Sequence, residues 1–426
     1  MKLRVQPGAL SGSVDIPGSK SHTIRGLILG MLADGRSVLR RPLRAADTES
    51  CIRVCEALGA RVDAAGQEQW TVRGTAGRPT AARGPVDVGN SGTTLFLAMT
   101  AAALAEGETE FMGDEQTSRR PAGPLMDALR ALGATAYSRH GNGCAPLVVG
   151  GGLRGGHATI ECPISQYLSS LLIGCPLAAQ DTTIGVPLLN EKPYAGMTLG
   201  WLDALGARYR ASEDFSRFEI PGRQRYPAFD RAVAADFSSA TFFLAAAAVT
   251  RSRLFLRGLD MADTQGDKAV AGMFQQMGCV VEAQPDGLWI EGPDELKGMT
   301  FDLNATPDAL PSLAVAGCFA RGETRLLNVP QARAKETDRL TVMSEELRRM
   351  GGRVEELADG LIVRPSRLRG AEVSGRADHR VVMALAVAGL AAEGVTTVDT
   401  AEAVSVTFPN FVELMQQAGA RMEIVS

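Results

Sequence analysis

The sequence lacks the features that mark several classes of protein. Its formal net charge is −4, so there is no general excess of positive charge for nucleic acid, and any anion site must be a local group of lysines and arginines. The longest wholly apolar run, residues 381–392, has 12 residues and is too short to span a bilayer. Residues 1–5 resemble a strand and contain no apolar signal-peptide region. We therefore expect a cytoplasmic protein that binds neither nucleic acid nor membrane.

Cysteine follows no metal-binding pattern. The seven cysteines include no C-x-x-C pair. Cys51 and Cys55 have helical i, i+4 spacing, but no histidine or second pair accompanies them. We expect buried or partly buried thiols in a reducing compartment, and neither a metal nor a cofactor.

The sequence does contain a strand–turn–helix segment, residues 14–25. An alternating run ends at Pro17 and Gly18, Lys20 and Ser21 follow, and an apolar helical run begins at Gly26. Unpaired N–H groups and the positive end of the helix dipole make such a helix start suitable for an anion. The segment is not a Walker loop. A single copy would be an ordinary N-cap, but the arrangement recurs.

A helix-ending glycine recurs six times, at positions 59, 133, 206, 278, 351 and 419, with spacings of 74, 73, 72, 73 and 68 residues. Each copy combines an apolar, Ala-rich helix with a second, amphipathic helix and short strands, which predicts a β-α-β-α-β-β unit about every 72 residues. The chain has 426 residues, so we expect two domains of three units each. The Ala-rich helices should be buried; they cover residues 26–33, 95–105, 167–179, 242–249, 312–320 and 381–392.

All six junctions between a strand and an Ala-rich helix are polar. In a compact repeat they should lie at one end of each domain, and two domains facing one another would enclose a cleft that collects anions. Basic residues also stand where the second helices begin, at Arg119 and Arg120, at Lys192, and at Lys335 and Arg339. We expect Lys335 and Arg339 to share one helix face.

Together these motifs resemble the enolpyruvyl transferases, and most closely the branch that acts on shikimate 3-phosphate, over essentially the whole chain. The motifs are Pro17-Gly-Ser-Lys-Ser with Arg25, Gly89-Asn-Ser-Gly-Thr, Arg120-Pro121, Ser165-Gln166, Lys335-Glu-Thr-Asp-Arg339 and Asp378-His-Arg380. The resemblance implies an α/β (α+β) fold, a two-domain inverse β-α-β barrel of six repeats. One domain would comprise residues 19–234 and the other residues 1–18 with 235–426, with hinges near 18–20 and 234–236. We expect a monomer.

The resemblance also implies a reaction. The enolpyruvyl group of phosphoenolpyruvate would pass to the 5-hydroxyl of shikimate 3-phosphate, releasing phosphate, on the route to chorismate and aromatic amino acids. Both substrates are phosphorylated carboxylates, which arginine forks bind well. By matching position, phosphoenolpyruvate would contact Lys20, Asn90, Gly92, Arg120, Gln166, Arg339 and Arg380. Shikimate 3-phosphate would contact Lys20, Ser21, Arg25, Ser165, Gln166, Tyr194, Asp308 and Lys335.

The same resemblance suggests Asp308 as the base for the hydroxyl, Lys20 and Glu336 in proton transfer, and His379 in a supporting role. Closure of the domains would exclude water. From the residues alone, Asp308 could instead cap a helix, and Glu336 could simply pair with Lys335 or Arg339. Gly92 resembles the form of its loop that leaves room for glyphosate, so we expect this herbicide to compete with phosphoenolpyruvate.

Five positions depart from the family pattern. Phe96 stands where arginine is usual, Ile164 and Glu191 where serine is common, Gln331 where asparagine is, and Val406 where some members have lysine. Glu191 would place a negative charge near a substrate phosphate unless its side chain turns away.

Because of these departures, two alternative functions stay open. One is transfer to another acceptor such as UDP-N-acetylglucosamine, although residues 113–121 lack the reactive cysteine of that branch. The other is a non-catalytic relative that binds phosphorylated metabolites.

Overall fold

The computed structural model describes residues 1–66 and 68–425, which form two compact units. Unit 1 consists of Met1–Pro17 and the chain from Ala234 onward, and unit 2 is Gly18–Val233. The sequence placed the two changes of domain one residue later, after residues 18 and 234.

Unit 2 is built from three copies of one motif. Each copy has a four-stranded sheet. In the order in which the strands pair, the second strand is parallel to the first and antiparallel to the third, and the fourth strand pairs antiparallel with the third at the edge. The sheets are β14 (Asp230–Ala232), β3 (Arg36–Arg40), β5 (Gln69–Arg73) and β4 (Arg61–Asp63); β6 (Val86–Asp87), β7 (Glu108–Met112), β9 (Leu147–Gly150) and β8 (Thr135–Ser138); and β10 (Gly156–Cys162), β11 (Thr182–Leu189), β13 (Arg217–Ile220) and β12 (Arg210–Ala211). The helices are α1 (Lys20–Leu32), α2 (Ala46–Ala57), α3 (Gly92–Ala103), α4 (Gly123–Ala131), α5 (Gln166–Gly174) and α6 (Lys192–Ala204).

Unit 1 repeats the same plan. Its sheets are β2 (Ser11–Asp15), β15 (Arg253–Arg257), β17 (Gly287–Glu291) and β16 (Val280–Gln284); β19 (Thr300–Asp302), β21 (Thr324–Leu327), β23 (Gly360–Arg364) and β22 (Arg353–Leu357); and β24 (Glu372–Val373), β25 (Thr396–Val398), β1 (Lys2–Gln6) and β26 (Arg421–Val425). The helices are α7 (Phe237–Thr250), α8 (Ala269–Gln276), α9 (Leu310–Phe319), α10 (Arg339–Arg349), α11 (His379–Ala391) and α12 (Phe411–Gln417). Five of the six predicted β-α-β-α-β-β repeats are therefore confirmed in chain order, and the sixth takes its last strand, β1, from the N-terminus.

Two strands exchange places between the repeats. The strand before α1 is β2, but it pairs with β15 of unit 1, with Val14 opposite Leu256. The strand before α7 is β14, but it pairs with β3 of unit 2, with Arg231 opposite Leu39. This exchange explains why unit 1 contains both ends of the chain and why the chain passes between the units twice.

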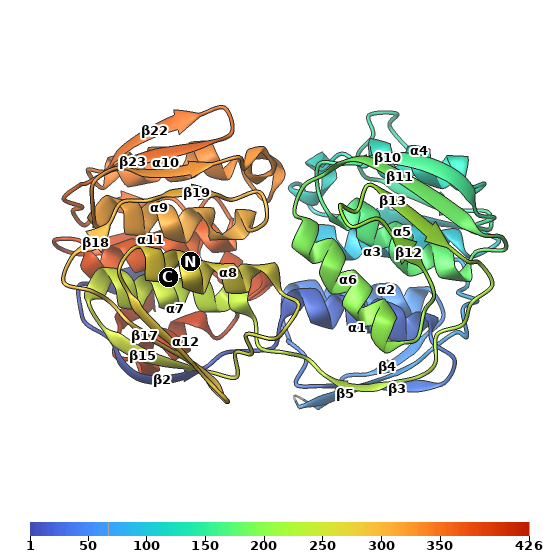
Figure 1. Cartoon of the computed structure of the whole chain (residues 1–426), viewed down its shortest axis with the longest axis horizontal. Helices are drawn as coiled ribbons and strands as arrows, with labels where there is room; N and C mark the ends of the chain where they lie inside the picture. The colour runs from blue at the N-terminus through green and yellow to red at the C-terminus, as the bar shows by residue number, and fades with distance from the viewer. Residues whose placement is uncertain (67, 426) are drawn as a thin grey trace. The chain divides into compact units, whose positions relative to one another are not determined.

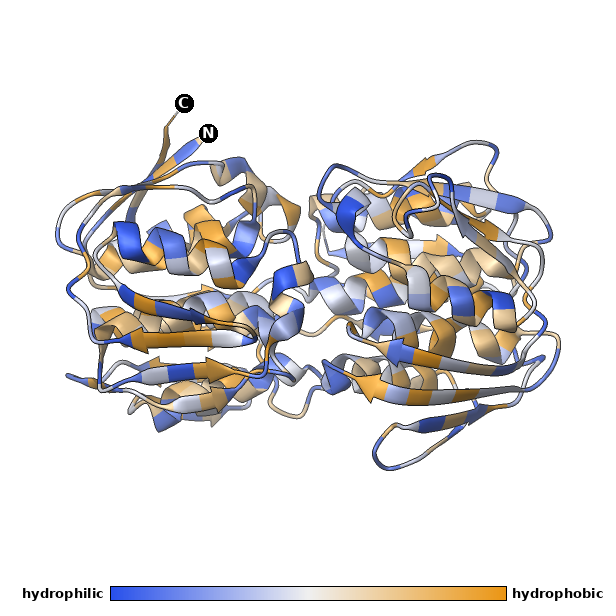
Figure 2. Cartoon of the chain, turned by 90° about the horizontal axis from the view of Figure 1, so that it is seen from above, coloured by the Kyte–Doolittle hydropathy of each residue, from blue (hydrophilic) through white to orange (hydrophobic). Residues whose placement is uncertain are grey.

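The Ala-rich helices form the inside of each unit. In unit 1, α7, α9 and α11 pack against one another, and Figure 1 shows them between the sheet that contains β22 and the sheet that contains β15. In unit 2, α3 packs against α1 and α5. Figure 2 shows the apolar colour concentrated on these inner helices, whereas polar and apolar residues alternate along the strands. The apolar faces of the sheets and helices are thus used for the core of each unit. The polar residues at the helix starts are not needed for the core, so they can form binding sites.

The glycines that define the repeat have the conformation that their position requires. Gly59, Gly133, Gly206, Gly278, Gly351 and Gly419 all have positive φ, between 70° and 108°. Each follows the amphipathic helix of its repeat, where a left-handed residue ends the helix and glycine adopts this conformation without a steric penalty. The predicted helix-ending role of these six glycines is confirmed.

One local prediction is wrong. Lys335 and Arg339 do not share a helix, because α10 begins at Arg339 and Lys335 lies in the irregular segment before it. Asp338 causes this start: its side chain accepts a hydrogen bond from the N–H of Thr341 and caps the helix.

Among the described residues, no helix combines the length and the apolar character needed to cross a bilayer.

Candidate active site

Lys20, the first residue of α1, forms an ion pair with Asp47 at the start of α2. Its Nζ lies 3.1 Å from Oδ2 of Asp47, and the two side chains are 14% and 5% exposed. Thr94, near the start of α3, donates its hydroxyl to the backbone oxygen of Asp47 at 3.5 Å. The starts of three helices therefore meet at Asp47. Asp47 is not among the site residues predicted from the sequence. An acidic residue in the first turn of a helix, as Asp47 is in α2, could have indicated a charged group at this helix start.

Arg25 joins α1 to α5 and α6 inside unit 2. Its Nε donates to the hydroxyl of Thr198 at 2.8 Å, and Nη2 donates to the hydroxyl of Ser169 at 3.3 Å and the backbone oxygen of Tyr194 at 3.0 Å. Nη1 donates to the backbone oxygen of Ser21 at 3.1 Å. These four acceptors are neutral.

Burial lowers the pKa of Arg25 to about 10, and the charges of Tyr194 and Glu191 oppose this change. A buried guanidinium among neutral acceptors attracts an anion, because few local charges balance it. Two predicted ligands of the acceptor substrate, Ser21 and Tyr194, are thus brought to Arg25, but through their backbone oxygens.

Ser165, which precedes α5, meets Glu191, which precedes α6. The N–H and the hydroxyl of Ser165 both donate to Oε2 of Glu191, at 3.2 and 2.9 Å. Glu191 is only 1% exposed, so its side chain does not turn out to solvent. The predicted ligand Gln166 is the next residue and begins α5.

Gly92 begins α3 beneath the guanidinium of Arg120. A Cβ atom at position 92 would overlap Nη1 of Arg120. Glycine therefore lets Arg120 lie directly at the start of α3. Asn90, two residues earlier, donates its amide to Asp114 and Gln116, both at 2.6 Å, which ties the loop before α3 to the segment leading to Arg120.

The departures from the family pattern have local explanations at two positions. Phe96 is buried in the core of unit 2 and packs edge-on against Tyr167, with ring centroids 5.2 Å apart. An apolar ring suits this position. Gln331 is also buried and donates its amide to the backbone oxygen of Asn304 at 3.0 Å.

Arg339 is the centre of a charge cluster in unit 1. It is 1% exposed, and its Nε lies 2.8 Å from Oδ2 of Asp378 while Nη1 lies 2.9 Å from Oδ1 of Asp308. Nη2 pairs with Glu336. Burial acts to lower the pKa of Arg339, but Asp378, Glu336 and Asp308 outweigh it and raise that pKa above its ordinary value. Arg339 is therefore a fixed cation.

Asp308 connects Arg339 to Arg380. Its second oxygen, Oδ2, lies 2.8 Å from Nη2 of Arg380. Helix α9 begins two residues later, without a side-chain cap. The open question of whether Asp308 simply caps a helix is thus answered: it bridges two guanidinium groups. Asp378, in contrast, does cap its helix, accepting hydrogen bonds from the N–H groups of Arg380 and Val381.

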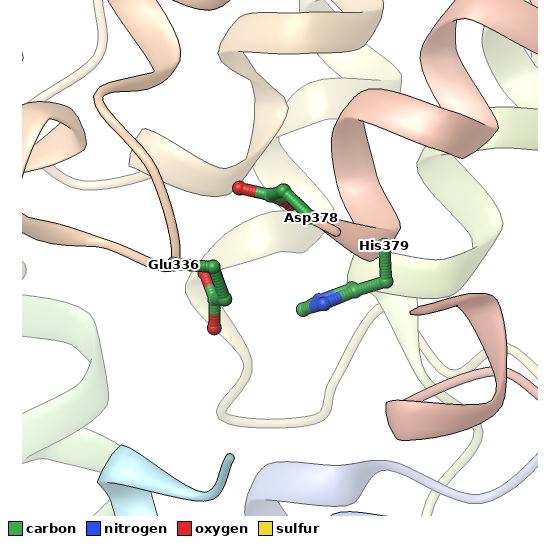
Figure 3. Close-up of side chains that lie close together, drawn as sticks. All are labelled: Glu336, Asp378 and His379. Atoms are coloured by element: carbon green, nitrogen blue, oxygen red, sulfur yellow. The ribbon is translucent and has the colours of Figure 1, made fainter. Parts of the chain in front are cut away.

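Glu336, Asp378 and His379 lie close together at the start of α11. Figure 3 shows the ring of His379 pointing toward Glu336, and one potential ligand atom from each of the three residues lies within 4.8 Å of the others. Both carboxylates are bound by Arg339, so a metal ion here would have to compete with a guanidinium. The guanidinium groups of Arg339 and Arg380, which lie against the same cluster of carboxylates, are the groups here that suit an anion.

Comparisons with known proteins agree over nearly the whole chain. Residues 5–415 match the family model described as EPSP synthase (3-phosphoshikimate 1-carboxyvinyltransferase). Two relatives, from Acetivibrio thermocellus and Ruminiclostridium cellulolyticum, are named 3-phosphoshikimate 1-carboxyvinyltransferase. The first is 50% identical, with 99% of each chain covered, and the second is 48% identical, with 100% of each covered. A solved structure of EPSP synthase from Acinetobacter baumannii is 25% identical, covers 100% of both chains and superimposes with a TM-score of 0.85.

Proposed function

Since this chain belongs to the EPSP synthase (3-phosphoshikimate 1-carboxyvinyltransferase) family, we propose that the cationic sites described above hold the two substrates of that reaction. The chain is a transferase of the shikimate pathway. It transfers the enolpyruvyl group of phosphoenolpyruvate to the 5-hydroxyl of shikimate 3-phosphate and releases phosphate. What remains to be assigned is the role of each residue.

Phosphoenolpyruvate carries a carboxylate and a phosphate, and it needs several fixed cations. We assign Arg339 and Arg380 of unit 1, together with Lys20 and Arg120 of unit 2, to this substrate. The observation that carries the assignment is the double ion pair of Asp308 with Arg339 and Arg380, at 2.9 and 2.8 Å. Because the two guanidinium groups are close enough to bind the carboxylate of Asp308 together, they are also close enough to bind an anionic group of the substrate together. Gln166, Asn90 and the helix start at Gly92 complete this set.

The acceptor, shikimate 3-phosphate, is assigned to the residues around α1, α5 and α6. Arg25 is the buried cation of this set. The other members lie at the starts of the three helices: Ser21 in α1, Ser165 and Gln166 at α5, and Tyr194 in α6. Lys335 of unit 1 is the further cation of this set. Because shikimate 3-phosphate has a ring with hydroxyls besides its anionic groups, a mixed set of hydroxyl, amide and cationic groups suits it.

The proton transfers follow from the bonds that change. As the 5-oxygen of shikimate 3-phosphate attacks C2 of phosphoenolpyruvate, its proton leaves and the C3 methylene gains one. We assign Asp308 to accept the hydroxyl proton, and Lys20 with Glu336 to supply and later remove the proton at C3. Loss of that proton from the tetrahedral adduct breaks the C2–O bond to phosphate and restores the enol double bond.

The geometry adds a condition for Asp308. It is held by Arg339 and Arg380, so it can accept a proton only after giving up at least one of them. Anionic groups of phosphoenolpyruvate binding to these arginines would release it. In this proposal, binding of one substrate prepares the base that acts on the other. We assign a supporting role in this cluster to His379, which lies beside Glu336.

We also infer that the protein works as a monomer in the cytoplasm. The seven cysteines are free thiols, six of them buried, which fits a reducing compartment. Light scattering of the purified chain would test the monomer.

A phosphate-release assay tests the function directly. Purified protein is mixed with phosphoenolpyruvate and shikimate 3-phosphate, and inorganic phosphate and the enolpyruvyl product are measured. Controls omit either substrate or replace the acceptor by UDP-N-acetylglucosamine. We expect release only with both substrates and only with shikimate 3-phosphate. Folded protein that releases no phosphate from the authentic pair would refute the proposal.

A further inference from the structure

Glu191 places a buried carboxylate among the residues assigned to the acceptor substrate. It stands immediately before α6 and is 1% exposed. Its Oε2 atom accepts both the N–H and the hydroxyl of Ser165, at 3.2 and 2.9 Å. A single carboxylate oxygen therefore takes both donors that Ser165 offers at the start of α5. A substrate anion cannot accept these hydrogen bonds while Glu191 holds them.

Arg25 provides the positive charge of the same region. Its hydrogen bonds go to the neutral acceptors Thr198, Ser169, Ser21 and Tyr194. Glu191 is one of the two groups whose charge favours the protonated form of Arg25. The negative charge of Glu191 therefore favours the cationic form of Arg25 while its Oε2 atom accepts hydrogen bonds from Ser165.

The backbone at Glu191 adopts an unusual conformation. Glu191 has φ 56° and ψ 36°, in the left-handed region that residues other than glycine seldom adopt. Such a conformation persists where neighbouring interactions hold it, and the two hydrogen bonds from Ser165 do so here. The carboxylate is therefore a built part of the site and not a loose surface group.

A phosphate group requires what Glu191 already occupies. It carries about −1.5 to −2 charges near neutral pH and presents three strong acceptor oxygens. It binds best to backbone N–H groups at a helix start, hydroxyl donors and a nearby arginine. Ser165 at the start of α5 and Arg25 supply these three kinds of group.

We propose that Glu191 is a specificity-determining residue whose carboxylate takes the anion position at Ser165 in the unliganded enzyme, so that the phosphate of the acceptor must displace it. The inference rests on the proposed assignment of Ser165 and Arg25 to the acceptor substrate. Its consequence is a weaker affinity for the acceptor than a neutral side chain at position 191 would allow. Only a ligand with more charge and more acceptor oxygens than a carboxylate gains from the exchange.

The test is a comparison of steady-state kinetics for the full-length protein and Glu191→Gln, which removes the charge and keeps the shape. Charge-assisted hydrogen bonds are roughly twice as strong as neutral ones, so the KM for shikimate 3-phosphate should fall about tenfold. The kcat and the KM for phosphoenolpyruvate should stay unchanged. Inorganic phosphate, as an inhibitor competitive with the acceptor, should show a parallel fall in its inhibition constant. Glu161→Gln, an exposed carboxylate of β10, is the matched control and should change none of these values.

The outcomes separate the inference from the proposed function. An acceptor KM that is unchanged or higher in Glu191→Gln, or a KM that falls equally for both substrates, would overturn the inference. If the wild-type protein does not turn over, the proposed function fails, and the inference is tested by calorimetry with inorganic phosphate alone, which Glu191→Gln should bind more tightly. Should Glu191→Gln not fold, Glu191→Ser removes the same charge with a smaller side chain and should shift the same constants in the same direction.

Discussion

Replacing Arg339 by alanine tests whether this residue is the cation on which the unit 1 cluster depends. The guanidinium is 1% exposed and pairs with Asp378, Asp308 and Glu336, whose side chains are 0%, 18% and 10% exposed. Its removal leaves carboxylates inside the protein without their main counter-ion. The unfolded chain would hydrate the same groups, so the change should lower the free energy of unfolding.

The magnitude follows from what each carboxylate retains. Asp308 keeps Arg380, and Asp378 keeps two backbone N–H groups at the start of α11. The three losses therefore do not add, and we expect the cost of one broken buried pair, about 3–5 kcal/mol. For a cooperative unit of this size that corresponds to a fall in Tm of about 10 °C.

The assay is calorimetric unfolding, because two units can give two transitions and only that of unit 1 should move. The double variant Arg339→Ala/Asp378→Asn should recover part of the loss, since it also removes the most buried charge. Arg321→Ala is the matched control: its ion pair with Glu295 is 3.6 Å long and joins side chains that are 80% and 59% exposed. Such a pair is worth at most about 1 kcal/mol. An Arg339→Ala protein as stable as the Arg321→Ala protein would refute the reasoning.

Three further predictions concern single positions. Gly92→Ala should push the guanidinium of Arg120 off the start of α3 and raise both the KM for phosphoenolpyruvate and the inhibition constant of glyphosate by about tenfold or more, measured by phosphate release. Asp308→Asn should lower kcat by about 10²–10⁴ while the KM values change much less, because a base is lost; an equal loss in kcat with Glu161→Gln would contradict this. Native protein at pH 8 should react with one equivalent of a thiol reagent, at the half-buried Cys144, and with seven after unfolding. Burial raises the pKa of Cys144, so its thiolate is scarce at pH 8 and its reaction rate should climb steadily toward pH 9 and beyond.

The repeat architecture could be predicted from the sequence because its signals are local. A left-handed glycine after a helix has a direct steric reason, and Gly351 with φ 92° illustrates it. The Ala-rich helices are apolar on most faces, so their burial follows from composition alone, as α7 and α9 show.

The strand exchange is different. The segments before α1 and α7 have the same local pattern, and only the resemblance to a family indicated that β2 would join the other unit. Pairing with β15 in place of β3 depends on contacts between residues more than 200 positions apart in the sequence, such as Val14 and Leu256. Local pattern contains no information about such a choice.

The residues of the candidate site were easier to name than their partners. Lys20, Arg25 and Arg339 stand in recognisable motifs, whereas Asp47, which binds Lys20, is 27 positions away and lies in an ordinary helix start. The error at Lys335 has a similar origin. Helical spacing to Arg339 suggested one helix face, but the cap formed by Asp338 outweighs the helical propensity of the preceding residues.

The buried carboxylates of the candidate site share one property, which is that each lies against a group that we assign to a substrate. Lys20 is paired with Asp47, Ser165 donates to Glu191, whose charge also acts on Arg25, and Arg339 is paired with the unit 1 cluster. On the proposed assignment, an anion that binds to any of these groups replaces a carboxylate of the protein, so the favourable binding energy is the difference between two similar interactions. A ligand that offers only a carboxylate gains little from such an exchange. A phosphate, with more charge and a third acceptor oxygen, gains more. We therefore propose that internal neutralisation keeps the buried cations stable without ligand and selects phosphorylated substrates over their unphosphorylated analogues.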